Sequence, residues 1–210
     1  IHHWKLTDLS GTKVPNSVQG SSGLVSSGGR YNASGVQFNG IDEDISGTGL
    51  NEPITFRSFS AWIYLDLSGN KDYPILTINA AGTGNNIWLN IMLRYQKRNN
   101  IFKYRPFMTY RNETLGRSEY FPWRGKLDDD YISYFDKKWC HLVFTINDKG
   151  ADGIDFSLYL NGLKIISRLS TNNILPSSGN YTRIYIGRWE DTGRGLFKGT
   201  IRDVRIYNEP

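Results

Sequence analysis

The chain of 210 residues has a single cysteine, Cys140, so it cannot form an internal disulfide. Cys140 lies in the alternating segment Trp139–Ile146, where a buried thiol is the expected state. His141 is its neighbour in the sequence, but adjacent residues of a strand point to opposite faces. A Cys–His nucleophile is therefore not expected here.

Long apolar runs and basic clusters are also missing. No stretch of about 18 apolar residues occurs, so insertion into a membrane is not expected. The net charge is +5, but the basic residues are scattered among acids, which argues against nucleic acid as a partner. No segment has the apolar spacing and caps of an amphipathic helix, and no internal repeat is evident.

Aromatic residues and short alternating segments are what the chain does contain. Aromatic residues make up 14% and charged residues 21%, which is typical of a chain that folds around a core. The alternating runs end in turn formers, and Asn161-Gly162 is a strong signal for a two-residue hairpin. The pattern predicts an all-β fold, an antiparallel β-sandwich, with residues 1–210 as one domain.

Large apolar side chains are expected to fill the gap between the two sheets. The residues expected there are Trp62, Trp139, Phe144, Leu158, Leu160, Ile186, Val204 and Ile206. The chain starts at Ile1 without a methionine and stops at Pro210 just after an expected strand. We therefore expect a module taken from a larger, multidomain protein.

Seven segments, in order along the chain, resemble the laminin G-like, concanavalin A-like jelly-roll family in its bacterial and viral branch. They are Trp4–Gly11, Val36–Asp42, Phe59–Ile63, Trp139–Val143, Leu158–Gly162, Ile184–Gly187 and Gly199–Asn208. The resemblance covers nearly the whole chain and implies a concanavalin A-like jelly roll with a structural role for His141. It implies no single activity, because this fold hosts lectins, adhesion modules, glycosidases and lyases.

The resemblance also implies a structural Ca²⁺ ion, which many relatives hold between the N-terminal loop and the last strand. Calcium takes six to eight oxygen ligands from carboxylates and carbonyls. The matching positions are Asn16, Asp42 and Asp203, and Asn16 replaces a carboxylate of the family pattern, which should weaken binding. The alternative is that Asn16 and Asp42 only close turns through side-chain to backbone hydrogen bonds.

Residues 94–138 differ from the rest, because aromatic residues alternate there with arginines and acids. Sugar rings stack on aromatic rings and their hydroxyls pair with charged groups, so we expect a surface for a polysaccharide or glycan, with the loop after residues 184–187 as one rim. The expected ligand-binding residues are Tyr104, Tyr110, Arg111, Tyr120, Trp123, Trp189 and Glu190. The alternative is an insertion whose aromatic residues pack on the edge of the sandwich and whose charges are solvated.

The sequence thus predicts a carbohydrate-binding module of a larger surface, secreted or virion protein that acts outside the cell. An enzyme that degrades cell-wall polysaccharide is one alternative. A glycosidase needs two carboxylates, and Ile41–Ile45 matches only part of the glucanase pattern. For a lyase, Arg105, Tyr110, Arg111 and Tyr120 could supply the neutralising and basic groups.

A protein-adhesion module is the second alternative. The loops at the edge of a sandwich can bind a protein partner. Sequons at Asn32, Asn112 and Asn180 permit glycosylation if the chain is secreted from a eukaryote.

Overall fold

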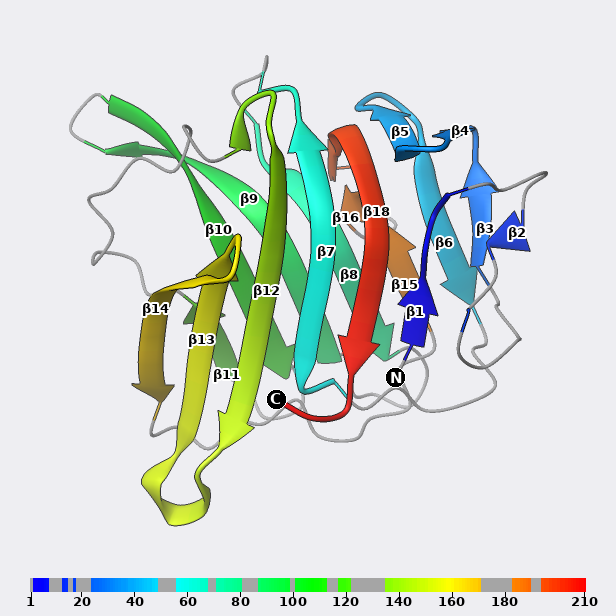
Figure 1. The fold of residues 1–210 in the computed structure, drawn as a ribbon. Coiled ribbons are helices and arrows are strands. Elements are labelled where there is room, and N and C mark those ends of the chain that lie inside the picture. The colour runs from blue at the N-terminus through cyan, green and yellow to red at the C-terminus, as the bar shows by residue number, and fades with distance from the viewer. Residues whose placement is uncertain are drawn as a thin grey trace.

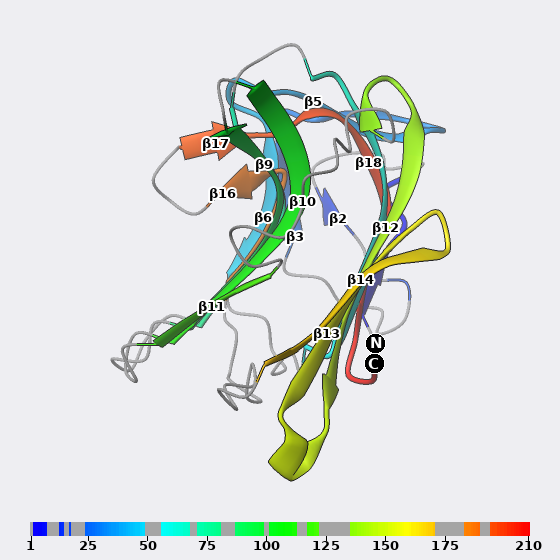
Figure 2. The ribbon, with the colours of Figure 1, turned by 90° about the vertical axis from the view of Figure 1, so that its left-hand side faces the viewer.

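The computed structural model describes residues 2–7, 13–14, 17, 24–48, 56–67, 71–80, 87–98, 101–112, 117–121, 135–170, 183–189 and 194–210. Within these ranges the chain forms two antiparallel sheets of eight strands each and one sheet of two strands (Figure 1). The two large sheets lie face to face as the two layers of a sandwich, as the edge-on view of Figure 2 shows. The predicted all-β sandwich is confirmed.

The sheet nearer the viewer in Figure 1 is called the front sheet. Its strands, in spatial order, are β14 (Leu163–Ser170), β13 (Ile154–Leu160), β12 (Trp139–Asp148), β7 (Ser58–Leu65), β18 (Lys198–Tyr207), β5 (Gly35–Asn39) and β4 (Arg30–Asn32). Strand β1 (His2–Trp4) pairs with residues 204–206 of β18, beyond the stretch 198–201 that pairs with β5. The first strand of the chain therefore pairs with the last.

The other large sheet is called the back sheet. Its strands, in spatial order, are β11 (Arg117–Phe121), β10 (Ile101–Asn112), β9 (Ile87–Arg98), β8 (Tyr73–Ala80), β15 (Arg183–Ile186), β6 (Asp44–Thr48), β3 (Leu24–Ser27) and β2 (Lys13–Val14). The hairpin of β16 (Arg188–Trp189) and β17 (Arg194–Leu196) forms the third sheet. Residues 94–138, which the sequence set apart, thus contribute β10, β11 and part of β9 to the back sheet.

Strict alternation decides which side chains enter the core. In β12, Cys140, Leu142, Phe144 and Ile146 are buried, while the residues between them are partly exposed. The same pattern buries six of the expected core residues, which are Phe144, Leu158, Leu160, Ile186, Val204 and Ile206. The prediction for Trp62 and Trp139 is wrong. Both are half-buried on the outer face of the front sheet, because they alternate with buried Ile63 and Cys140.

A β-bulge interrupts β18 where its neighbour changes from β5 to β1. The register with β7 shifts between Arg202 and Arg205, and Asp203 takes a left-handed φ of 52°. The Asp203 N–H donates to the carbonyl of Lys5 at 2.9 Å, so it bonds to the chain just after β1. A bulge of this kind re-aims side chains locally, and here Nη2 of Arg205 lies 3.5 Å from the Asp203 carboxylate.

The two ends of the sandwich carry different features. The start of β18 pairs with Asn39, so the β5–β6 turn lies at one end. The 3-10 turn η1 (Gly150–Asp152), between β12 and β13, lies at the opposite end, near which both termini also lie (Figure 1).

Candidate functional site

Tyr104 and Tyr110, two of the expected ligand-binding residues, belong to the core of the sandwich. Tyr110 is 1% exposed and Tyr104 is 4% exposed, and both join the hydrophobic cluster between the sheets. Tyr104 packs on Tyr73 and Tyr95, with ring centroids 5.8 and 5.1 Å away. The prediction that these two rings stack on a sugar is wrong, because both are buried. Arg111 has the opposite parity in β10, so it cannot share a face with either tyrosine.

Most of the remaining expected ligand-binding residues lie outside the part of the chain that the structure describes. Trp123 and Glu190 lie outside the described residues, and so do the side chains of Arg111 and Tyr120. Trp189 is half-buried in β16. Of the four residues named for a lyase, alternation places Tyr110 on the opposite face of β10 from Arg105, so the four do not share one face.

The expected calcium ligands do not come together. Asp42 lies in the turn after Asn39, at the Lys198 end of β18, whereas Asp203 lies five positions further along that strand. At about 3.3 Å per residue the two are roughly 15 Å apart, so they cannot ligate one ion. Asn16 lies outside the described residues, among which no group of three His, Cys, Asp or Glu side chains could hold a metal ion.

Asp203 has other partners. Its carboxylate accepts a hydrogen bond from Nε2 of His3 at 2.9 Å and lies 3.5 Å from Nη2 of Arg205. Burial alone would raise the pKa of Asp203, but the His3 hydrogen bond and the Arg205 charge outweigh burial and lower it. Asp203 therefore ties β1 to β18 as an ionised carboxylate.

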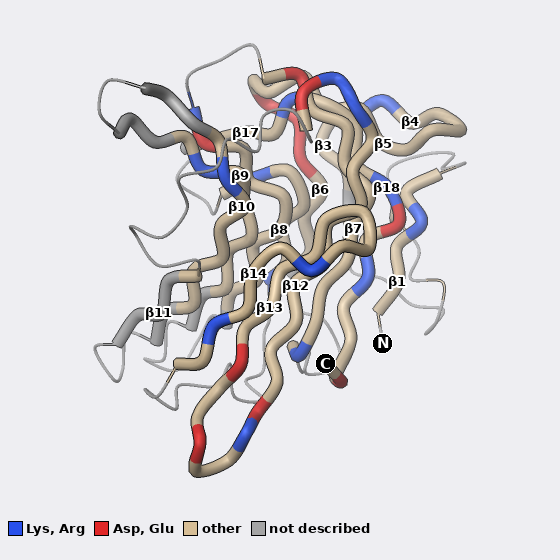
Figure 3. The backbone as a smooth tube through the Cα atoms, turned by 60° about the vertical axis from the view of Figure 1, so that its left-hand side comes forward, with Lys and Arg blue, Asp and Glu red and all other residues tan. Residues whose placement is uncertain are grey.

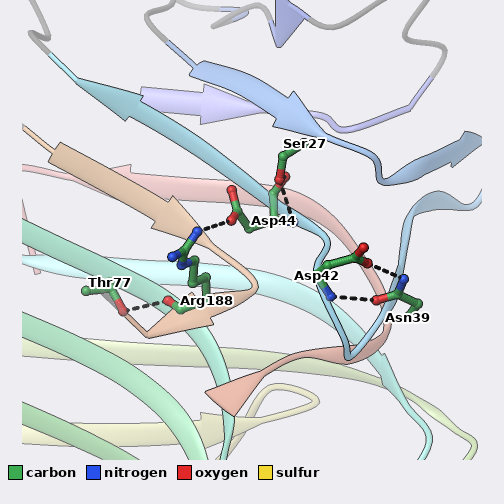
Figure 4. Close-up of polar contacts among 6 residues, drawn as sticks. All are labelled: Ser27, Asn39, Asp42, Asp44, Thr77 and Arg188. Atoms are coloured by element: carbon green, nitrogen blue, oxygen red, sulfur yellow. Dashed lines mark hydrogen bonds and ion pairs between the residues drawn. The ribbon is translucent and has the colours of Figure 1, made fainter. Parts of the chain in front are cut away.

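The β5–β6 turn is held rigidly by its own polar groups. Oδ1 of Asn39 accepts from the N–H groups of Ile41 and Asp42 at 2.7 and 3.2 Å, and Nδ2 donates to Asp42 at 2.7 Å (Figure 4). The Asn39 N–H donates to Glu43 at 2.5 Å. Such side-chain to backbone bonds close turns without any ligand, which is the alternative considered above for Asp42.

Next to this turn, Asp44 anchors the β16–β17 hairpin. Asp44 is 2% exposed, and its Oδ2 lies 2.9 Å from Nη1 of Arg188 (Figure 4). The hydroxyl of Thr77, in β8, donates to the carbonyl of Arg188 at 2.9 Å. The three acids at 42–44 thus have separate partners, within the turn for Asp42 and Glu43 and in the β16–β17 hairpin for Asp44.

A pocket of about 210 Å³ opens between the turn and the outer strands of the front sheet. Its lining residues are Arg30, Gln37, Phe38, Asn39 and Glu43. Phe38 is buried and packs edge-on against Phe197 at 5.9 Å, because alternation in β5 turns its ring into the core. The side chains that line the pocket from outside are therefore the four polar ones. A pocket of this size suits one small polar unit, since pockets for drug-sized ligands begin at about 300 Å³.

The pocket continues into a row of side chains across the outer face of the front sheet. Directly opposed residues of antiparallel strands project to the same side, so the pairing register defines the row. Its members, from β4 to β12, are Arg30, Gln37, Thr200, Tyr64 and Trp139. All five are exposed or half-buried. We call this set the outer row.

An aromatic cluster lies beside the far end of the outer row. The His141 ring stacks on Trp62 with centroids 4.9 Å apart, and Tyr64 lies 5.7 Å from Trp139. The Arg202 guanidinium lies 4.4 Å from the Trp139 ring centroid and 5.6 Å from that of Trp62. We call Trp62, Trp139, His141 and Arg202 the Arg202 cluster.

The ionisable groups His141 and Cys140 of β12 both have shifted pKa values. Burial lowers the pKa of His141, and the Arg205 charge lowers it further against a smaller opposing effect of Asp203. Burial raises the pKa of the Cys140 thiol to about 12, and Cys140 and His141 point to opposite faces as expected. Alternation of Trp139 and His141 with buried neighbours was the signal in the sequence that could have found the Arg202 cluster.

The chain matches a known protein superfamily. The family model of the concanavalin A-like lectin/glucanases superfamily matches residues 44–210. The chain belongs to this superfamily. No match is found among curated protein sequences. In the part of the chain that the structure describes, no helix is long and apolar enough to cross a membrane.

Three solved structures illustrate the fold. Trypanosoma rangeli sialidase, in complex with 2,3-difluorosialic acid, has a TM-score of 0.65 and 15% identity over 100% of this chain and 31% of the sialidase chain. The botulinum neurotoxin serotype D binding domain has a TM-score of 0.60 and 16% identity over 100% of this chain and 47% of its own. The chain thus spans about a third to a half of these structures.

Domain 4 of an extracellular arabinanase from Geobacillus stearothermophilus, in complex with arabinotriose, is closer in size. It has a TM-score of 0.52 and 17% identity over 89% of this chain and 76% of its own. At such identities the likeness concerns the fold.

Proposed function

We propose that this superfamily member is a carbohydrate-binding module, part of a larger surface, secreted or virion protein that acts outside the cell. The pocket beneath Arg30, Gln37, Asn39 and Glu43 is the observation that carries the proposal. The arabinanase domain of the same fold, solved with arabinotriose, supports a saccharide as the ligand class.

The lining of the pocket has the chemistry that a sugar requires. Each sugar hydroxyl both donates and accepts hydrogen bonds. The guanidinium donates, the carboxylate accepts and the amide of Gln37 does both, whereas Oδ1 of Asn39 already accepts from two N–H groups of the turn. The hydrogen bonds that fix Asn39 and Glu43 in the turn preorganise these groups, so little entropy is lost on binding. The volume of about 210 Å³ indicates a single sugar unit in the pocket.

The pocket proposal is tested with Glu43→Gln and Arg30→Gln. A screen against a glycan array identifies a ligand, and titration calorimetry then measures its affinity for each variant. We expect each substitution to weaken binding by on the order of tenfold or more, because each removes a charged hydrogen-bonding group. Asp152→Asn and Lys149→Gln are the matched controls, since they remove the same charges from exposed positions at the far end of the molecule (Figure 3).

Two results would overturn the proposal. One is the absence of glycan binding by the folded protein, or binding that the pocket variants leave intact. The other is release of new reducing ends or unsaturated uronates from a polysaccharide, which would show an enzyme.

A further inference from the structure

We propose that the ligand is an anionic glycan that lies across the strands of the front sheet, from the pocket to the Arg202 cluster, with a carboxylate or sulfate group at the Arg202 guanidinium. This inference rests on the proposed function. It adds the direction in which the glycan lies, the charge of the glycan and the residue that binds its charged group.

The outer row supplies the path. It crosses five adjacent strands, and four strand spacings of about 4.8 Å give a length of roughly 19 Å. Gln37 also lines the pocket, and between it and Trp139 lie Thr200 and Tyr64, each with a hydroxyl that can bond to a sugar hydroxyl. The row therefore matches an oligosaccharide that enters the pocket with one terminal unit.

Arg202 is a cation without an anion. Its guanidinium contacts two indole rings, and no carboxylate pairs with it among the described residues. Its Nε is buried and has no hydrogen-bond partner there. The neighbouring acids are engaged, because Asp203 pairs with His3 and Arg205, and Asp66 pairs with Lys198 at 2.9 Å.

The indole rings make Arg202 a preorganised site. Cation–π contacts hold the guanidinium in place and displace water from its faces, which leaves its edges for a ligand. A planar guanidinium binds carboxylate and sulfate oxygens in bidentate fashion and keeps its charge at any pH of interest. Burial and Arg205 keep His141 mostly neutral near pH 7, so the permanent charge of the cluster is that of Arg202.

The strand beside Arg202 packs closely against β18 and carries no side chain at the adjacent position. Gly35 of β5 is its neighbour, and a Cβ at Gly35 would lie 2.6 Å from the carbonyl oxygen of Ile201 and 3.0 Å from the Cβ of Arg202. No side chain therefore separates Arg202 from the pocket side of the sheet at this position. At the pocket, Arg30 also has no carboxylate partner among the described residues, so the outer row and the Arg202 cluster hold two such arginines and no acid.

The experiment compares polymers that differ only in charge. Polygalacturonate is paired with its methyl ester, and dextran sulfate with dextran, and binding to the full chain is measured by calorimetry or affinity electrophoresis at low and moderate salt. We expect at least one anionic polymer to bind about tenfold or more tightly than its neutral partner. The preferred pair tells whether a carboxylate or a sulfate is read.

The variants separate a site from general charge attraction. Arg202→Gln should remove the preference for the anionic polymer, whereas Lys149→Gln, which removes one charge at the far end, should keep it. Arg202→Lys should retain part of the preference and also serves if Arg202→Gln does not fold. Equal losses in Arg202→Gln and Lys149→Gln, or equally tight binding of oligothymidylate, would show non-specific attraction of polyanions and overturn the inference.

Failure of the inference is distinguishable from failure of the proposed function. If neutral and anionic polymers bind alike and only the pocket variants weaken them, the module binds carbohydrate but the role of Arg202 is wrong. If no glycan binds at all, both are wrong.

Discussion

At the scale of single residues, Gly199 shows how closely β18 lies against β7. Its φ is +141°, and a Cβ built on it would lie 2.1 Å from the carbonyl oxygen of Tyr64. Backbone occupies that space, so no side-chain movement relieves the clash. The pairing that places Thr200 opposite Tyr64 in the outer row thus depends on a residue without a side chain.

We expect Gly199→Ala to lower the free energy of unfolding by about 3 kcal/mol, from the clash and the unfavourable φ together. Urea unfolding followed by tryptophan fluorescence measures the change. Gly150→Ala is the matched control, since Gly150 also has a positive φ of 62° but nothing within 4 Å of a Cβ. Its cost should be about 1 kcal/mol, from the backbone alone. Equal costs in both variants would contradict the steric argument.

Single residues also show where sequence reasoning reached the site and where it did not. The opposite orientation of Cys140 and His141 followed from alternation and is confirmed. Tyr104 and Tyr110 were grouped with Arg111 because all three are close in sequence, although their parity in one strand separates them. In β7 both alternating sets contain large aromatic or aliphatic groups, so composition could not tell that Trp62 faces outward.

At the scale of elements, the β16–β17 hairpin depends on one buried ion pair. Asp44 comes from β6 and Arg188 from β16, so the pair fixes the hairpin to the back sheet. Oδ1 of Asp44 is buried and has no hydrogen-bond partner among the described residues, so Arg188 is the cation that offsets its charge.

We expect Arg188→Ala to lower the free energy of unfolding by about 3 kcal/mol, because a buried carboxylate would lose its cation. The double variant Asp44→Asn, Arg188→Gln should recover a large part of this loss. Lys198→Ala breaks an exposed pair with Asp66 and should cost at most about 1 kcal/mol. Denaturant midpoints compare the three proteins, and a double variant as unstable as Arg188→Ala would argue against a buried-charge penalty.

The positions of the strands along the chain were easier to predict than their pairing partners in the sheets. Alternation predicted strands at 58–65, 139–146, 156–162 and 197–207, which overlap β7, β12, β13 and β18. The predicted hairpin turn at Asn161-Gly162 joins β13 and β14. Alternation could not tell which strands pair. The pocket and the outer row join the neighbouring strands β4 and β5 with β7, β12 and β18, which lie far from them along the chain. Periodicity within one strand carries no information on such partners.

At the scale of the whole molecule, His141 makes stability depend on pH. Its folded pKa is lowered, so the unfolded chain binds the proton more readily. The free energy of unfolding should therefore fall as the pH drops below about 6.5, the unfolded value, and continue to fall until the folded pKa is passed. The lowered pKa of Asp203 adds a separate loss of stability only below the ordinary value of 3.8 for an aspartate.

We expect His141→Gln to remove the loss of stability below about pH 6.5 and to keep the loss that Asp203 causes below pH 3.8. Urea midpoints at pH 7.5, 5.5 and 3.5 test this for both proteins. The lost stacking on Trp62 lowers stability equally at every pH, so the readout is the difference between pH 7.5 and 5.5. An unchanged difference in the variant would mean that His141 does not titrate in this range.

The pairing of β1 with the end of β18 has a consequence for how such a module is displayed. Both termini lie at the end of the sandwich near η1, away from the β5–β6 turn (Figure 1). Any polypeptide that continues beyond either terminus would start from the end of the sandwich near η1. A host protein could then carry the module on two adjacent tethers, with the Arg30 pocket at the tip that first meets an approaching surface.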